Sequence, residues 1–277
     1  MISILKAFAW FSASVVTALR GVWWDYVICA FQKEKKINLY DNTKFVFSTY
    51  GDIANILYSS SFLCRFKRSF EYKTFELLSK TLKSGNIVLD IGANVGAHAL
   101  FMAKIVGSTG KVYAFEPDKT TFDALKHNID RNGYKGTIIP FNLALSDKDS
   151  EVILKKPPTS SKKNTGDAYN YISEVNEKSE NSIKAVVLDD FLAKENISQV
   201  NFIKIDVEGA ELLVFNGASK LLEEKKPIII TECNEDWCAR FDYTVFDVLK
   251  KISTHGYSIK NYDYEQWVAK PILTDKI

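Results

Sequence analysis

Short apolar runs alternate with amphipathic segments along most of the chain, from about residue 83 onward. The apolar runs have the length of buried strands, and most are followed by a segment with helical periodicity. Strands are predicted at residues 87–91, 111–116, 137–142, 183–188, 200–206 and 227–232, helices at 97–105, 120–132, 188–196, 211–215 and 241–253, and a closing antiparallel pair at 257–262 and 266–269. This order indicates an α/β fold with a doubly wound, mostly parallel sheet and an antiparallel C-terminal strand.

The first 36 residues differ from the rest of the chain. They are rich in large apolar side chains and carry five basic and two acidic residues. The longest uncharged run, Ala7–Leu19, is shorter than the ~20 residues that span a bilayer, and its polar neighbours gather near one side of a helix. We therefore predict an N-terminal helical extension over 1–36 that either contacts a membrane surface or packs against the domain or a partner subunit.

Two further segments set the domain boundaries. Residues 37–82 are predicted as an accessory unit, with a hairpin over 37–50 and an amphipathic helix over 66–82, and the main domain follows over 83–277. Residues 155–182 contain Pro157-Pro158 and a polar run, so they are predicted as a surface insertion. Two interpretations of this insertion stay open: a lid whose Tyr169 and Tyr171 stack on substrate, or a solvated loop.

Composition and charge narrow the class of protein. The 277 residues carry a formal net charge of +2, without the basic surplus typical of nucleic-acid binders, so no nucleic-acid partner is predicted. The four cysteines, Cys29, Cys64, Cys233 and Cys238, form no CxxC pair, so we expect free thiols in a reducing compartment rather than a zinc site. These features predict a cytoplasmic protein, with membrane association and homodimer formation left open.

A glycine turn, Gly92-Ala-Asn-Val-Gly96, directly follows the strand at 87–91. A strand that ends in such a turn and passes into a helix brings free backbone N–H groups to a bound nucleotide. The spacing lacks the second glycine of the G-x-G-x-x-G dinucleotide motif, and Asp90 would place a negative charge beside a pyrophosphate. S-adenosylmethionine, a cationic nucleoside without phosphate, fits this acid better, and an NAD-dependent oxidoreductase is the alternative.

The ends of the next two strands supply further candidates for cofactor binding. Glu116 ends the strand at 111–116, where a carboxylate can accept both hydroxyls of a ribose, and Pro117 follows it. Asn142 ends the strand at 137–142. The Asn142 amide and the backbone through Leu143 are predicted to flank an adenine ring.

Acidic residues follow several of the predicted strands and should meet at the carboxyl edge of the sheet. Because like charges repel unless they are compensated, a cationic cofactor, a metal or Lys204 is expected beside them. The five acids expected at this edge are Asp90, Glu116, Asp206, Glu208 and Glu232.

Acids at this edge could serve as a catalytic base, and the candidates are Asp206, Glu208 and Glu232. These three acids could also hold a divalent cation, but no dedicated metal spacing is present and no metal ligand is assigned. His98, in the first turn of a helix, is a weaker candidate that we expect to pack or cap. Glu211 is expected either to face solvent or to interact with the helix dipole.

The order of these motifs resembles the FkbM-type family of S-adenosylmethionine-dependent methyltransferases. The resemblance is carried by VLDIGANVGAHAL, KVYAFEPD, HNIDRNG, NLALSD, FIKIDVEGAELLVFNGA and PIIITE, between about residues 77 and 232. It implies a class I, Rossmann-like methyltransferase sheet of seven strands, and methyl transfer to an oxygen of a sugar, glycan or small natural product. It also implies that the cofactor is held by Asp90, Gly92, Asn94, Gly96 and Glu116, with Asp206 near the donor methyl.

An alternative interpretation is that the protein is not an enzyme. The same fold could serve as a cofactor-binding scaffold whose N-terminal extension docks on a membrane or a partner. The acids retained at the predicted strand ends favour the enzyme.

Overall fold

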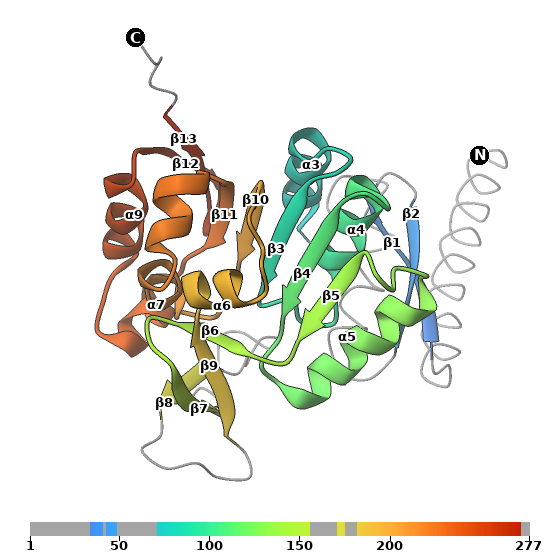
Figure 1. The fold of residues 1–277 in the computed structure, drawn as a ribbon, viewed down its shortest axis with the longest axis horizontal. Coiled ribbons are helices and arrows are strands. Elements are labelled where there is room, and N and C mark those ends of the chain that lie inside the picture. Colours follow the sequence, from blue (N-terminus) through green and yellow to red (C-terminus); the bar gives the residue numbers. More distant parts are fainter. Residues whose placement is uncertain (1–33, 41–42, 49–70, 156–170, 175–181, 273–277) are drawn as a thin grey trace, which may run out of the picture.

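The computed structural model describes residues 34–40, 43–48, 71–155, 171–174 and 182–272 (Figure 1). The membrane contact predicted for residues 1–36 falls almost wholly outside these residues and stays a prediction. Within the described part of the chain, no helix combines the length and the apolar character needed to cross a membrane.

The central sheet has seven strands in the order β12-β13-β11-β10-β3-β4-β5. β13 runs antiparallel to β11 and β12, and the other strand pairs of this sheet are parallel. The strands are β3 (Ile87–Ile91), β4 (Lys111–Phe115), β5 (Ile138–Phe141), β10 (Phe202–Ile205), β11 (Ile228–Glu232), β12 (Tyr257–Asp263) and β13 (Gln266–Pro271). This topology confirms the predicted doubly wound, mostly parallel sheet with its closing antiparallel pair.

Side chains alternate along these strands between two apolar layers. Val88 and Phe202 pack into one layer, and Leu89 and Ile203 into the other. The first layer, which we call the α4 face, is covered by α3 (Tyr72–Thr81), α4 (Ala97–Val106) and α5 (Lys119–Arg131). The second, the α7 face, is covered by α6 (Leu188–Lys194), α7 (Glu211–Asn216) and α9 (Val245–Thr254) (Figure 1).

Three short helical segments connect these elements. They are η2 (Leu221–Lys225), α8 (Glu235–Cys238) and η3 (Ala239–Phe241). The Asn234 side chain caps α8 by accepting hydrogen bonds from the backbone N–H groups of Asp236 and Trp237. The chain between β11 and α9 is therefore held close to the carboxyl end of β11.

The predicted hairpin is present as β1 (Glu34–Tyr40) and β2 (Thr43–Ser48), and it begins earlier than the expected residue 37. The Asn132 side chain, at the end of α5, accepts a hydrogen bond from the Val46 N–H and donates one to the Val46 carbonyl, both at 2.8 Å. Ile37 and Phe47 are buried in the same layer as Val88. The hairpin therefore shares the core of the main domain.

The helix predicted over 66–82 begins later, at Tyr72, among the described residues. Glu71 adopts a left-handed conformation with φ of 46°, which cannot continue a helix toward the N-terminus. Thr74 and Lys73 then bind the β12–β13 hairpin, through Gln266 and Asp263 at 2.5 and 2.8 Å. Glu71 is fixed at the point where the chain enters the domain.

The insertion predicted over 155–182 is bounded by strands of a second sheet, in the order β6-β9-β7-β8. Its strands are β6 (Ala144–Ser146), β7 (Ser150–Lys155), β8 (Tyr171–Glu174) and β9 (Ile183–Val187). The strand predicted at 183–188 therefore exists but belongs to this small sheet. The interpretation as a solvated loop is wrong for Lys155 and for 171–174, which pair as β7 and β8.

Candidate functional site

The glycine turn after β3 is clamped between two neighbouring strands. The N–H groups of Gly92 and Ala93 both donate to the Phe115 carbonyl at the end of β4, at 3.0 and 2.9 Å. On the other side, a Cβ placed on Gly92 would lie 1.8 Å from the Asp206 carbonyl oxygen. Gly92 also has a φ of +81°, so both its conformation and its packing require glycine.

Replacing Gly92 by alanine should destabilise the protein by more than the ~1–2 kcal/mol of a left-handed alanine, because overpacking adds roughly 1–3 kcal/mol. Gly133→Ala is the matched control, since Gly133 has a φ of +76° and nothing within 4 Å of the added Cβ. Thermal unfolding of both variants measures the difference. Equal losses of stability in the two variants would show that the Asp206 carbonyl moves aside without an energetic cost.

Glu116 closes the turn from the side of β4. Its two carboxylate oxygens accept hydrogen bonds from the N–H groups of Asn94 and Asp118, each at 2.9 Å. Burial raises the pKa of Glu116 to about 7, against the lowering effect of those two N–H groups. Each oxygen keeps further acceptor capacity, which matches a carboxylate that receives the two hydroxyls of a ribose.

Asn142 braces this region from the end of β5. Its amide nitrogen donates to the carbonyls of Glu116 and Pro117, at 2.9 and 2.8 Å. Both amide hydrogens are thereby used, so a contact between this side chain and an adenine ring would have to use its Oδ1. Leu143 is partly buried against the α7 face.

A second group of predicted residues lies on the α4 face of the sheet. Asp90 and Lys204 are register neighbours on β3 and β10, and Asp206 follows Lys204 by two positions. The Lys204 Nζ lies 3.0 Å from Asp206 Oδ2. Burial would lower the pKa of Lys204, but Asp206, Asp90 and Glu71 raise it above its ordinary value. Lys204 is therefore the internal counter-charge that the sequence predicts.

Asp90 is fully buried, and neither of its carboxylate oxygens has a hydrogen-bond partner among the described residues. Burial raises its pKa, although Lys204 and His98 act in the opposite direction. An unpaired buried carboxylate is costly and calls for a positively charged ligand or a proton.

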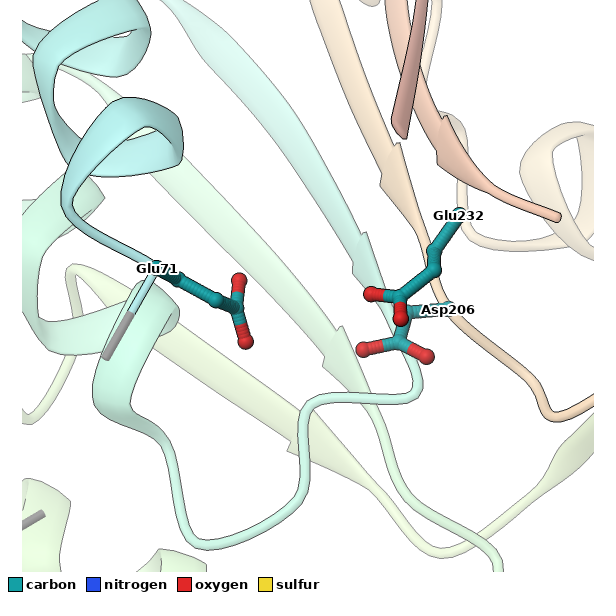
Figure 2. A group of neighbouring side chains, drawn as sticks. All are labelled: Glu71, Asp206 and Glu232. Carbon is teal, nitrogen blue, oxygen red and sulfur yellow. The ribbon is translucent and has the colours of Figure 1, made fainter. Parts of the chain in front are cut away.

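Glu71 completes this group and was missed by the sequence analysis. Figure 2 shows its carboxyl facing those of Asp206 and Glu232, with one oxygen from each within 4.8 Å of the others. Its Oε2 lies 2.9 Å from the Nε2 of His98, which stacks on Phe75 with ring centroids 4.8 Å apart. No motif marks Glu71 in the sequence, because only the tertiary fold brings residue 71 to the ends of β10 and β11.

The charges around Glu71 keep it ionised. Burial alone would raise its pKa, but His98 and Lys204 lower it to about 2. His98 is buried between Phe75 and this carboxylate, which agrees with the expected packing role.

The turn after β10 carries the other predicted acids. Glu208 has a left-handed φ of 57°, and burial, with the charges of Asp206 and Glu232, raises its pKa. Burial and Asp206 likewise raise the pKa of Glu232. The solvent alternative for Glu211 is wrong, because the side chain is 1% exposed and its Oε1 accepts from the N–H groups of Val207 and Gly209. Its place in the first turn of α7 is the one that the dipole alternative expects. The buried Glu211 carboxylate thus stabilises the turn between β10 and α7 through these two backbone N–H groups.

Aromatic and basic side chains flank this turn. The Arg240 guanidinium lies 4.9 Å from the ring centroid of Tyr171, which comes from β8 of the small sheet. Arg240 also donates to the Glu208 carbonyl at 3.5 Å, and Phe241 stacks on Tyr243. The Tyr243 hydroxyl donates to the Gly209 carbonyl. Tyr171 thus reaches the acid-bearing turn, whereas Tyr169 lies outside the described residues.

The structure therefore separates the predicted site residues into two adjoining groups. The first surrounds the glycine turn and comprises Gly92, Asn94, Gly96, Glu116, Pro117, Asn142 and Leu143. The second is acidic and comprises Asp90, Asp206, Glu208 and Glu232, joined by Glu71. The Gly92–Asp206 approach puts the two groups in direct contact.

The two matching families and the relatives described below are all methyltransferases. The family described as Methyltransferase FkbM domain matches residues 90–259, more than half of the chain. A second family, described as protein-L-isoaspartate(D-aspartate) O-methyltransferase, matches residues 26–151. The hexuronic acid methyltransferase AglP of Haloferax volcanii is 29% identical over 160 residues, which cover 58% of this chain and 61% of AglP.

Two further matches add detail. The 31-O-demethyl-FK506 methyltransferase FkbM of Streptomyces tacrolimicus is 25% identical over 202 residues, covering 64% of this chain and 75% of that protein. The crystal structure of an FkbM methyltransferase from Methylobacillus flagellatus KT superposes with a TM-score of 0.51 and 17% identity, covering 79% of this chain and 55% of that one, and shows the fold. The matches span 61% and 58% of the lengths of AglP and of Methyltransferase 1 of Beauveria bassiana.

Proposed function

Because the chain belongs to the FkbM-type methyltransferase family, we propose that it transfers a methyl group to a hydroxyl oxygen of a sugar, glycan or small natural product. S-adenosyl-L-methionine is the cofactor, as the sequence predicts. The observation that carries the proposal is the packing of Gly92 against the Asp206 carbonyl, since it joins the nucleotide turn to the acid-bearing turn. The NAD-dependent oxidoreductase is not supported by the comparisons.

On the cofactor side, the residues around the glycine turn fit S-adenosylmethionine. The Glu116 carboxylate would accept hydrogen bonds from the ribose hydroxyls. The backbone of Gly92, Asn94 and Gly96 in the turn would lie against the nucleoside. Asp90, on β3 just before the turn, would add negative charge close to the cofactor. When bound, S-adenosylmethionine supplies an electrophilic methyl group on a positively charged sulfur.

The raised pKa of Glu116 predicts a pH dependence of cofactor affinity. The carboxylate accepts both hydroxyls, whereas the protonated acid loses acceptor capacity, so affinity should rise as the pH increases through about 7. If only the ionised form binds well, the dissociation constant of S-adenosylhomocysteine should fall about tenfold between about pH 6 and about pH 8. Calorimetric titration across this range measures it. Glu116→Gln should flatten the dependence, and an equally steep curve in that variant would contradict the assignment.

On the acceptor side, one of the acidic residues would act as the general base. Asp206, Glu208 and Glu232 stand at the ends of β10 and β11, where one of their carboxylates would take the hydroxyl proton. Burial and the neighbouring carboxylates raise the pKa values of Glu208 and Glu232, so the ionised form that can take a proton becomes more populated as the pH rises above neutral. Holding the acceptor oxygen in line with the methyl group accounts for much of the remaining rate enhancement.

The surroundings of these acids favour an acidic saccharide as the acceptor. Arg240 offers a guanidinium that binds carboxylates with well-defined geometry, and the adjacent rings of Tyr171 and Phe241 offer apolar faces for a sugar ring. The name of one relative, a hexuronic acid methyltransferase, points to the same class.

The test is to incubate the full chain with S-adenosylmethionine carrying a deuterated methyl group. The acceptors, supplied in separate reactions, are matched uronic-acid and neutral oligosaccharides, small hydroxylated natural products, protein and nucleic acid. Mass spectrometry should find one labelled methyl ether, formed faster on the acidic saccharide. Label found on a protein or nucleic acid, with none on any saccharide or small natural product supplied, would contradict the proposal.

A further inference from the structure

Three carboxyl groups converge from distant parts of the chain. Glu71 precedes α3, Asp206 follows β10 and Glu232 ends β11, yet one oxygen from each lies within 4.8 Å of the other two (Figure 2). All three are partly buried. Oxygen atoms at this spacing can surround one hard cation, whose bonds to oxygen are about 2.0–2.6 Å long.

Asp90 gives an independent indication that a positive ligand lies here. It is fully buried, and both of its oxygens lack a hydrogen-bond partner in the described part of the chain. Its position on β3 matches that of Val88, so its side chain projects to the α4 face, as do Lys204 and Glu232 on their strands. The same face holds Glu71 and His98. Asp90 therefore points into the layer where the three carboxyls meet.

The balance of charge leaves room for a cation. Five carboxyl groups gather at this edge: Glu71, Asp90, Asp206, Glu208 and Glu232. The basic groups that act on them are Lys204, Arg240 and His98, and His98 counts only when protonated. S-adenosylmethionine brings one net positive charge. If all five carboxyls are ionised, at least one lacks a counter-charge even when the cofactor is bound, and a bound cation would favour these ionised forms.

We propose that Glu71, Asp206 and Glu232 form a binding site for a divalent cation of the oxygen-preferring class, such as Mg²⁺ or Mn²⁺. The sequence pattern suggests Asp206, Glu208 and Glu232 for such a role. In the structure Glu71 takes the place of Glu208, which leaves Glu208 available as the base. If the proposed methyl transfer holds, the cation would bind an acceptor oxygen and make its proton easier to remove. Binding of the cation itself does not depend on that function.

The experiment uses the full chain after treatment with a chelator and titrates it with Mn²⁺, with free Mn²⁺ measured by electron paramagnetic resonance. One ion per chain should bind, and Mg²⁺ should displace it. Glu71→Gln and Glu232→Gln should each weaken Mn²⁺ binding by about tenfold or more. Glu76→Gln is the matched control, because Glu76 lies on α3 near Glu71 but forms an outward pair with Lys80. It should bind Mn²⁺ like the unmodified chain.

Circular dichroism checks that each variant is folded. Because two ligand variants are made, the test can still be read if one of them does not fold. The proposal is overturned if no Mn²⁺ binds at millimolar concentration, or if both ligand variants bind it as well as the control does. Titration of the same metal-free protein with S-adenosylhomocysteine separates the two proposals. Cofactor binding without Mn²⁺ binding removes the metal site alone, whereas Mn²⁺ binding without cofactor binding removes the methyltransferase.

Discussion

Replacing Lys204 by methionine is expected to lower the free energy of unfolding by about 3–5 kcal/mol at neutral pH, because it leaves buried carboxylates without their counter-charge. The Lys204 side chain is 4% exposed and lies 3.0 Å from Asp206 Oδ2. It also acts on the fully buried Asp90 and on Glu71. Methionine keeps the length and apolar stem of the side chain, so the loss measures mainly the charge. Chemical denaturation at fixed pH gives the value.

Lys73→Met is the control for this measurement. Lys73 pairs with Asp263 at 2.8 Å, but the two side chains are 56% and 42% exposed, so the loss should stay near or below ~1 kcal/mol. A loss of similar size at both lysines would show that Lys204 is not the counter-charge of a buried group.

The loss at Lys204 should also depend on pH. Glu71 has its pKa lowered from 4.5 to about 2 in the folded protein. A lowered pKa contributes stability that is present above pH 4.5 and is lost as the pH falls toward 2. Because Lys204 supplies part of that lowering, the difference between the native chain and Lys204→Met should shrink across this window.

Asp206→Asn is expected to reduce turnover by about 10²–10⁴-fold while the affinity for S-adenosylhomocysteine changes only a few-fold. Asp206 is partly buried beside Lys204, and its carbonyl touches the cofactor turn, so it sits where the two groups of site residues meet. Asparagine preserves the shape of the side chain and removes its charge. Single-turnover measurements on the acceptor found by isotope labelling give the rate.

Asp236→Asn provides a matched control, since Asp236 is an exposed acid on α8. Its turnover should equal that of the unmodified chain. If Asp206→Asn and Glu208→Gln both left turnover unchanged, neither acid would be the base, and Glu232 would remain.

The sheet and its carboxyl edge could be predicted from the sequence because their signals are local. Each of β3, β4 and β10 is a short apolar run, and an acid stands at or just beyond the end of each. In a doubly wound fold, the ends of parallel strands meet at one edge, so Asp90 and Asp206 could be placed near each other without coordinates.

The small sheet and Glu71 could not be predicted in this way. β6 has only three residues, and β7 and β8 are separated by a long polar segment, so neither showed a strand period that stood out. Glu71 belongs to a stretch that is predicted as a helix, but in the fold it has a left-handed conformation before α3 and its carboxylate lies beside His98. The solvent alternative for Glu211 failed because its burial comes from hydrogen bonds to the turn before α7, which only the folded chain shows.

The central claim, a cofactor site for S-adenosylmethionine at the turn after β3, is tested most directly by calorimetric titration of the full chain with S-adenosylhomocysteine and, in parallel, with NAD⁺. We expect one S-adenosylhomocysteine per chain and no binding of NAD⁺. Glu116→Ala should weaken the binding of S-adenosylhomocysteine by about 10²–10⁴-fold, since two hydrogen bonds to a charged acceptor are each worth about 1.5–3 kcal/mol. Binding of NAD⁺ without binding of S-adenosylhomocysteine would contradict the account.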